Sequence, residues 1–325
     1  MKLPRRQIFR LAVGAACLPL MPWIASALDY PTRPVHLIVP YPPGGFVDFA
    51  ARLIGPALSD RLGQQFVVDN KPGASSNIGT RTVVRASPDG YTLLVASNAN
   101  AHNATLYDNL DFNFIRDVTP IATIMRAPFV MIVSPSLSTK TIPQFIAYAK
   151  ANPGKISMGT AGSGSAVSIF GELFKAMAAV DLVAVHYRGV GPLLPDLMAG
   201  RVEVAFIPVA QAVGYVQSGQ LRPLGVTSTT RIDLLRDVPT INEFLPGYEG
   251  AASVGIVGPA NTPAEVIAIL NKEVNAAVAD PTFKASLAKF GAEPFASSPA
   301  EFKKFIADET EKWGKIIRAA GIKAE

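Results

Sequence analysis

The chain has 325 residues, of which 49% are hydrophobic and 17% charged; this excludes a disordered chain and allows two or three domains. Three histidines and one cysteine exclude a zinc cluster or an iron–sulfur site built from cysteine, and nearly exclude a multi-histidine metal site. The net charge of +5 comes mostly from residues 1–27, which hold four of the 30 basic residues and no acidic one. The rest of the chain is close to neutral, so we expect no nucleic-acid binding.

The first 27 residues predict an export signal. A basic stretch up to Arg10 precedes the apolar residues 11–24, and Ala25–Ala27 forms a small-residue cleavage site. The apolar stretch is shorter than the roughly 20 residues that a membrane span needs. Two adjacent arginines near the start also fit the twin-arginine pattern, so the twin-arginine and general secretion routes both stay open. Cleavage after Ala27 would remove Cys17, whose surroundings do not fit a lipoprotein signal.

Strands alternate with helices through the mature chain, as apolar runs bounded by Gly, Pro, Asn and Asp indicate. The predicted strands are residues 35–39, 66–68, 91–96, 129–133, 156–159, 182–185, 202–206 and 221–226. The predicted helices are residues 46–62, 78–86, 142–151, 166–178, 192–198 and 210–217. This order predicts an open α/β sheet in two units.

The C-terminal part of the chain is predicted to return to helix. Thr262–Glu265 and Ser298–Glu301 each fit a capping box with proline at the first helical position. Apolar residues then recur with helical spacing in both segments, and we predict that these stripes face the core.

Two Gly-rich turns precede helices, at residues 40–45 and 160–165, but neither matches a phosphate-binding loop or a nucleophile elbow. His36 and His186 lie in or at the end of predicted strands and are interpreted as structural. His102 lies in a polar segment and could line a cleft, but it has no evident catalytic partner. We therefore expect a protein that is not an enzyme and that needs no metal and no cofactor.

Both Gly-rich turns can hold an anion. A helix N-terminus presents unpaired N–H groups and the positive end of the helix dipole. Glycine lets a carboxylate approach the backbone, and serine and threonine hydroxyls add donors. Taken singly, each turn favours the interpretation as an ordinary strand–helix connection. Two such turns, one in each α/β unit, predict a site for a small carboxylate between the units.

Motifs along the mature chain resemble those of solute-binding receptors of tripartite tricarboxylate transporters, the Bug family. The matching stretches are YPTRPV (30–35), PGGFVD (43–48), DNKPGA (69–74), ASPDGYTLL (86–94), GSGS (162–165), HYRG (186–189), DVPT (237–240) and GPANTP (258–263). The resemblance extends from about residue 30 to residue 323, and the motifs stand in the family's order.

The resemblance implies an α/β, two-lobed type II periplasmic binding protein fold with hinge strands and a ligand cleft between the lobes. Behind the signal peptide of residues 1–27, it implies lobe one at 28–127 plus 228–325 and lobe two at 128–227. Such a receptor is expected to be a periplasmic monomer that captures a small organic carboxylate for a membrane permease with large and small subunits. The alternative is a sensor that presents the same ligand to a membrane histidine kinase.

The family's ligand lies between the first turn of lobe one and the Gly-Ser turn of lobe two. Carried over to this sequence, one wall comprises Tyr41, Pro43, Gly45, Phe46, Ser97 and Asn98. The other wall comprises Thr160, Ser163, Gly164, Ser165 and Tyr187. Asp48 belongs to the first wall, where we expect it to order the loop and offset the helix dipole.

Three positions depart from the family pattern. Ser168 stands where the family often has histidine, and Ser253 stands where tryptophan is common. Ile207, followed by Pro208, replaces an aspartate. If Ile207 and Phe46 line the cleft, a ligand ammonium would lose its water without finding a buried anion. We therefore expect a carboxylate or dicarboxylate with an aromatic or otherwise apolar body, and not an amino acid or a citrate-like acid.

Overall fold

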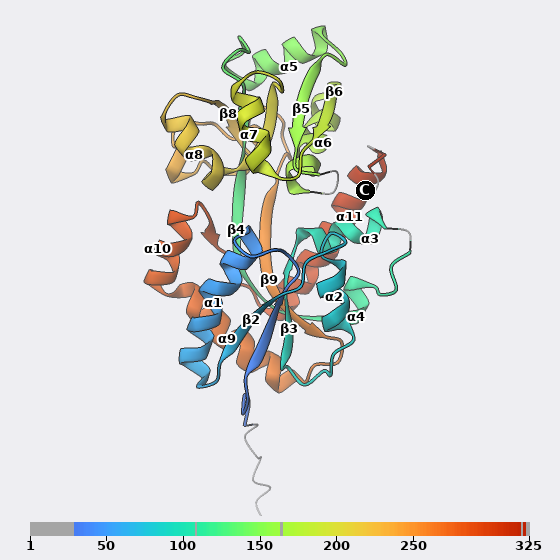
Figure 1. Ribbon diagram of the computed structural model, residues 1–325, viewed down its shortest axis with the longest axis vertical. Coiled ribbons are helices and arrows are strands. Elements are labelled where there is room, and N and C mark those ends of the chain that lie inside the picture. Colours follow the sequence, from blue (N-terminus) through green and yellow to red (C-terminus); the bar gives the residue numbers. More distant parts are fainter. Residues whose placement is uncertain (1–28, 108, 163–164, 320, 323–325) are drawn as a thin grey trace, which may run out of the picture. The chain divides into compact units, whose positions relative to one another are not determined.

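The computed structural model describes residues 29–107, 109–162, 165–319 and 321–322, and the described residues from Pro31 onward form one compact unit (Figure 1). The predicted signal peptide, with Cys17, lies outside the described residues. The first elements are β1 (Val35–Val39), α1 (Phe46–Leu62), β2 (Phe66–Asn70), α2 (Asn77–Val84), β3 (Thr92–Ser97), α3 (Asn98–Leu106) and α4 (Phe114–Asp117).

The middle of the chain continues the alternation of strands and helices. Its elements are β4 (Val118–Val133), α5 (Ile142–Ala151), β5 (Ile156–Thr160), α6 (Ala166–Ala178), β6 (Leu182–His186), α7 (Val190–Met198), β7 (Val204–Pro208), α8 (Val209–Gln217) and β8 (Arg222–Val226). After two short 3-10 helices, Asp233–Leu235 and Ile241–Glu243, the chain forms β9 (Ala251–Pro259), α9 (Ala264–Ala279), α10 (Pro281–Lys289), β10 (Glu293–Pro294) and α11 (Pro299–Ala319).

The long strand β4 takes part in two sheets, which define two lobes. Its residues 118–128 pair antiparallel with β9, and its residues 129–133 pair antiparallel with β7 and β8 (Figure 1). The first sheet has the order β2-β1-β3-β9-β4, in which β1 is parallel to β2 and β3. The second sheet has the order β4-β7-β5-β6, in which β5 is parallel to β6 and β7. The residue bounds predicted for the two lobes stay a prediction.

The helix α1 shows how local sequence sets an element's bounds. Its predicted range is confirmed at both ends. The helix ends at Leu62 because Gly63 adopts a left-handed φ of +70°, and its N–H closes the last turn on the Ser59 carbonyl. The face that carries Ile54 and Leu58 is fully buried against the first sheet.

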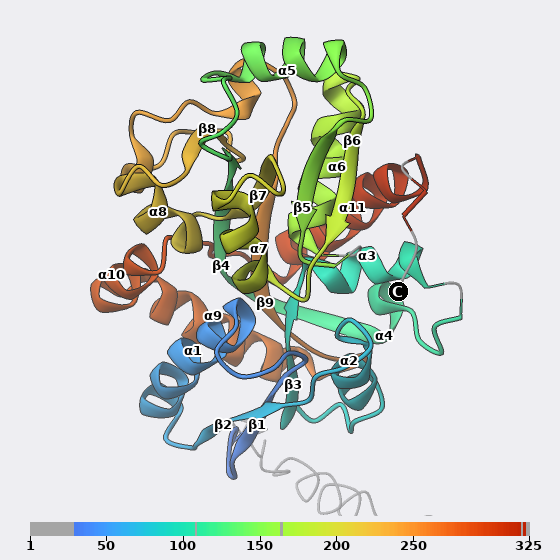
Figure 2. The ribbon, with the colours of Figure 1, turned by 45° about the horizontal axis from the view of Figure 1, so that its top comes forward.

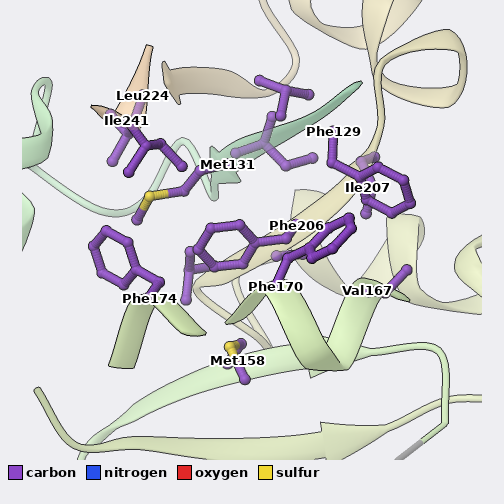
Figure 3. Close-up of a cluster of buried hydrophobic side chains, with 14 of the residues drawn as sticks. Phe129, Met131, Met158, Val167, Phe170, Phe174, Phe206, Ile207, Leu224 and Ile241 are labelled. Atoms are coloured by element: carbon purple, nitrogen blue, oxygen red, sulfur yellow. The ribbon is translucent and has the colours of Figure 1, made fainter. Parts of the chain in front are cut away.

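The helix α11 contributes to the buried apolar clusters of both lobes. Phe302 and Ile306, in its first half, belong to the cluster of the first lobe. Trp313 and Ile317, in its second half, belong to the cluster of the second lobe, which surrounds Phe206 (Figure 3). Figures 1 and 2 both show α11 beside α3, and its second half also packs on α6. This helix therefore connects the two cores.

The two predicted capping boxes have different outcomes. At α11 the box is confirmed, because Glu301 N–H donates to Ser298 Oγ at 3.2 Å and Ser298 N–H donates to a Glu301 carboxylate oxygen at 2.8 Å. At α9 the box is wrong. Pro263 takes the cap position there, and Thr262 Oγ1 donates to the Pro259 carbonyl at 2.8 Å. Within the described ranges, no helix combines the length and apolar character that crossing a membrane requires.

Candidate functional site

The carboxyl ends of the parallel strands in the two sheets point toward each other. In the first sheet, β3 ends at Ser97 beside Val254 of β9, and Val254 lies beside Met125 of β4. In the second sheet, β7 ends at Pro208, beside Phe129 of the same β4 strand. From Met125 to Phe129, β4 advances by four residue steps, which span about 13 Å. Since open α/β sheets bind ligands at such carboxyl edges, we place the candidate site at this interlobe edge.

A helix follows each of these strand ends, either directly or after a short turn. Within the described chain, α1 and α3 follow β1 and β3, and α6, α7 and α8 follow β5, β6 and β7. The first turns of α3, α6, α7 and α8 contain no acidic residue, so nothing in these turns neutralises the positive end of the dipole. Elsewhere in the fold, α9 and α11 carry Glu265 and Glu301 in their first turns. The interlobe edge is thus suited to an anion.

Asp48 orders the first Gly-rich turn from within. Its side chain is buried, and one carboxylate oxygen accepts from Gly44 N–H and Arg52 Nε, both at 2.8 Å. The other oxygen accepts from Asn70 Nδ2 at 2.8 Å, and the same amide donates to the Tyr41 carbonyl at 3.0 Å. Burial alone would raise the pKa of Asp48, but the arginine and the amide donors together lower it. Asp48 therefore holds the loop and does not present a free charge.

Tyr41 and Ser97, both predicted for the first wall, lie side by side. Their hydroxyl oxygens are 2.9 Å apart. Burial raises the pKa of the Tyr41 phenol, and the hydroxyls of Ser97 and Ser76 only partly offset this effect. The phenol is therefore neutral at ordinary pH and can donate a hydrogen bond. Ser97 also fixes the start of α3, because its N–H donates to Asn100 Oδ1 at 2.9 Å.

Exposed backbone lies next to an aromatic ring on the same wall. Pro43, Gly44 and Gly45 are exposed. Gly44 has a φ of +85°, and no atom of the described residues lies within 4 Å of the position that a Cβ would take there. Phe46 is half-buried, and its ring packs over Phe290 with 6.1 Å between the centroids. A ligand can thus approach the backbone of this loop beside an apolar surface.

The second Gly-rich turn is described on both sides of Ser163 and Gly164, which themselves lie outside the described residues. Gly162 has a φ of +97°, and a Cβ there would again meet no described atom within 4 Å. Ser165 caps α6, since its hydroxyl accepts from Ser168 N–H at 3.2 Å and donates to the Gly162 carbonyl at 2.8 Å. Ser168 is buried behind this turn.

Thr160 and Tyr187, both predicted for the second wall, are held by hydrogen bonds within the protein. Tyr187 N–H donates to the Thr160 carbonyl at 2.9 Å, and the buried Thr160 hydroxyl lies 2.6 Å from His186 Nδ1. The Tyr187 hydroxyl donates to Asp196 Oδ2 at 2.8 Å, and burial together with this carboxylate raises the pKa of Tyr187. Both side chains are occupied within the protein, and their contact with a ligand stays a prediction.

Ile207 lies in the core of the second lobe. Its side chain is 0% exposed, and Figure 3 shows it beside Phe129 in the cluster that contains Phe170. The expected apolar surface at this position is therefore not exposed at the interlobe edge. Pro208, the next residue, is half-buried and occupies the cap position of α8.

Asn98 is held by a polar network that sequence reasoning missed. Its Oδ1 accepts from Ser253 N–H at 2.5 Å and from Ser253 Oγ at 3.0 Å, and its Nδ2 donates to Glu309 Oε2 at 2.7 Å. Trp313 Nε1 donates to the same oxygen at 2.7 Å. One turn further along α3, His102 is 1% exposed and does not line an open surface. No cluster of three or more His, Cys, Asp or Glu within the described ranges is placed to hold a metal.

Comparison with known proteins gives consistent matches over most of the chain. The model of the tripartite tricarboxylate transporter family receptor matches residues 50–322. Protein BugT of Bordetella pertussis is 32% identical over 301 residues, 92% of each chain. The structure of R. palustris Rpa4515 with adipate is 35% identical and covers 91% of this chain and 100% of that chain, with a TM-score of 0.80. MatC (Rpa3494) from Rhodopseudomonas palustris with bound malate is 27% identical and covers 89% and 100%, with a TM-score of 0.75.

These matches confirm the resemblance predicted from the motifs and the two-lobed periplasmic binding protein fold. Members of the family are solute-binding receptors, which also confirms that the protein is not an enzyme. This chain belongs to the tripartite tricarboxylate transporter receptor family, which includes the Bug proteins, and it is a solute-binding receptor of the periplasmic binding protein type.

Proposed function

We propose that this receptor captures a small dicarboxylate with an apolar body in the periplasm and delivers it to a membrane permease with large and small subunits. Its proposed export rests on the signal predicted at residues 1–27. The delivery step follows from the family, whose receptors serve tripartite transporters.

The observation that carries the proposed ligand class is the pair of opposed strand edges with acid-free helix N-termini. Backbone N–H groups at the start of a helix bind a carboxylate without a cationic side chain. The edges are about 13 Å apart along β4. A diacid can therefore place one carboxylate at each edge and its hydrocarbon between them.

The side chains around the first turn favour an apolar body. The acidic residue in the first turn of α1, Asp48, has its oxygens occupied by three donors, so it offers no partner for a ligand ammonium. Burying an unpaired ammonium costs several kcal/mol, whereas hydrocarbon laid against Phe46 would gain about 25 cal/mol per Å². The related Rpa4515 was solved with adipate, which agrees with this preference.

A ligand screen tests this class. We expect adipate, or another diacid with an apolar or aromatic body, to give the largest thermal shift among adipate, succinate, benzoate, the phthalate isomers, malate, citrate, aspartate and glutamate. Calorimetry on the best ligand should give a micromolar or tighter Kd, about −8 kcal/mol or better. The proposed class is wrong if aspartate, glutamate or citrate gives the largest shift and calorimetry confirms that binding. Malate is included because MatC was solved with it.

Substitution of Gly164 tests the proposed role of the Gly-Ser turn. A leucine side chain there would occupy the space in which a carboxylate must approach the backbone. Gly164→Leu should weaken adipate binding at least about tenfold, ~1.4 kcal/mol, while the protein still melts cooperatively. Gly214→Ala on α8 is the control, since its added Cβ meets no described atom within 4 Å. Equal affinity in both variants would move the site away from this turn.

A further inference from the structure

Glu309 is a partly buried acid that touches the first wall from behind. It lies on α11, between the half of the helix that packs in the first core and the half that packs in the second. Its Oε2 accepts from Asn98 Nδ2 and from Trp313 Nε1, both at 2.7 Å. Asn98 directly follows Ser97, the residue that caps α3 at the interlobe edge. One carboxylate oxygen thus holds the first residue of a helix whose N-terminus belongs to the candidate site.

A small cavity borders both Glu309 and the start of α3. Its volume is about 20 Å³, and Ser97, Asn98, Ser253 and Glu309 line its polar side. A space of this size accepts about one water molecule. The space between Glu309 and the N-terminus of α3 is therefore short and holds little water. In such a space a charge on Glu309 acts more strongly on the N-terminus of α3 than it would in bulk water.

Two charged residues near Glu309, Lys312 and Glu249, act on its pKa in opposite directions. The charge of Lys312 lowers the pKa of Glu309, but no ion pair joins the two among the described residues. Lys312 Nζ instead donates to the Glu249 carbonyl at 2.8 Å and lies 4.9 Å from the centroid of the Trp313 ring. The Glu249 carboxylate acts in the opposite sense to Lys312. On α3 the titratable residue is His102, which stays neutral because burial lowers its pKa to about 3. The strand β9 presents only uncharged residues, including Ser253.

We propose that Glu309 couples carboxylate capture to the uptake of a proton. In the empty receptor, ionised Glu309 places a negative charge behind the N-terminus of α3, where it opposes an anionic ligand. Protonation of Glu309 by solvent removes this charge, and the carboxyl oxygen still accepts hydrogen bonds from Asn98 and Trp313. Because linkage is reciprocal, an anion bound at the interlobe edge favours the protonated form. This coupling rests on the proposed function of the site.

The direction of the coupling follows from the environment of Glu309. Burial raises the pKa of Glu309 from its ordinary value of 4.5. The hydrogen bond from Trp313, the charge of Lys312 and the hydrogen bond from Asn98 only partly oppose the rise. Glu309 is therefore still partly protonated at pH values where an exposed glutamate is ionised. Carboxylate binding should weaken as the pH rises through this raised pKa, by about three- to tenfold for one nearby charge.

Glu309→Gln separates the charge from the hydrogen bonds. The glutamine amide oxygen can accept both donors, so the variant keeps the geometry and loses the charge. Glu311→Gln is the matched control, because Glu311 is an exposed residue of the same helix that pairs with Lys315. The ratio of the adipate Kd of the unsubstituted chain to that of Glu309→Gln should be near one at pH 4.5 and rise to about three to ten at pH 8. The ratio for Glu311→Gln should stay near one. Adipate's own titration cancels in these ratios.

Two further measurements test the proton coupling independently of the Kd ratio for Glu309→Gln. Calorimetry of the unsubstituted chain with adipate, in two buffers with different ionisation enthalpies, should show a fractional proton uptake, at most about half a proton for a tenfold coupling. The uptake should peak between the pKa of Glu309 in the free receptor and its higher pKa in the complex. Once Trp23 is removed, by cleavage after Ala27 or by Trp23→Phe in the full chain, Trp313 is the single tryptophan. Without ligand, the fluorescence of Trp313 should change with pH as Glu309 titrates, with a midpoint above the ordinary pKa of a glutamate. This transition should vanish in Glu309→Gln.

Each outcome decides a separate claim. The coupling is overturned if adipate binds but the Kd ratio stays constant with pH, or if no proton is taken up, even when the Trp313 fluorescence titrates. If no carboxylate of the screen binds the unsubstituted chain, the proposed function fails and the coupling falls with it. Binding with a constant ratio, by contrast, contradicts only the role of Glu309.

Discussion

Between pH 7 and pH 4.5, the free energy of unfolding is expected to fall by about 2.5 kcal/mol less in His102→Leu than in the unsubstituted chain. His102 is 1% exposed on α3, its ring packs edge-on against Trp313, and neither ring nitrogen has a hydrogen-bond partner among the described residues. Burial lowers its pKa from 6.5 to about 3, so the folded protein keeps the ring neutral.

The direction of this change in stability follows from the number of protons that His102 binds in the folded and the unfolded chain. Between pH 6.5 and pH 3 the unfolded chain protonates His102 and the folded chain does not, so acid favours unfolding in this window. Leucine carries no proton and fills most of the same volume, so the variant should lose this part of the acid sensitivity. Urea unfolding at pH 7, 5.5 and 4.5 measures the difference.

A second histidine provides the control for this experiment. His36 is exposed on β1 and contacts Asp69, and its replacement by leucine should change the free energy of unfolding by no more than about 0.5 kcal/mol. If His102→Leu follows the same pH dependence as the unsubstituted chain, the buried ring is not held neutral in the folded protein.

The second large effect is expected at Gly79, where α2 packs on the strand end that leads into the first Gly-rich turn. A Cβ on Gly79 would lie 2.8 Å from Pro40 Cβ, 2.9 Å from Pro40 Cα and 3.0 Å from the Lys71 carbonyl oxygen. Backbone atoms cannot move away as a flexible side chain can. Gly79→Ala should therefore cost about 3 kcal/mol in stability, the upper part of the range for overpacking. It should also weaken adipate binding, since Pro40 directly precedes Tyr41.

The matched control is Gly214→Ala in the exposed part of α8. No described atom lies within 4 Å of its added Cβ, and alanine in a helix interior is favoured over glycine by up to about 1 kcal/mol. Denaturant unfolding of the two variants should thus give opposite changes in the free energy of unfolding. Similar values for both would show that α2 can move away from Pro40.

The elements that could be predicted are those with strong local boundaries. The helices Phe46–Leu62, Ile142–Ala151 and Ala166–Ala178 have their predicted bounds. Glycines or capping hydroxyls stop or start them, and these signals are local. The capping box at Thr262 failed for an equally local reason, because proline took the cap position.

The missed elements are those that tertiary contacts stabilise. The helix α3 contains four polar residues among its buried positions, Asn98, Asn100, His102 and Asn103, so it has no apolar stripe in the sequence. Asn103 is held by contacts to residues 75–77, which no local pattern shows. Of β4, only residues 129–133 were predicted; its first part contains Pro120 and shifts register twice against β9.

In the candidate site too, contacts between residues close in sequence could be predicted, and contacts set by the tertiary fold could not. Arg52 stands four residues after Asp48, a helical spacing that the sequence shows, and the two side chains do pair. The partnership of Asn70 with Asp48 depends on where β2 lies and has no sequence signal. The family pattern suggests that Ile207 lines the cleft, whereas the structure places its side chain in the core of the second lobe.

A crystal structure of this chain with adipate tests the central claim most directly. We expect one carboxylate beside Tyr41 and Ser97 at the start of α1 and α3, and the other at the turn of residues 160–165. The hydrocarbon should lie against Phe46, between the two edges that β4 connects. Adipate bound away from the interlobe edge, or with both carboxylates in solvent, would contradict the assignment of this edge as the ligand site.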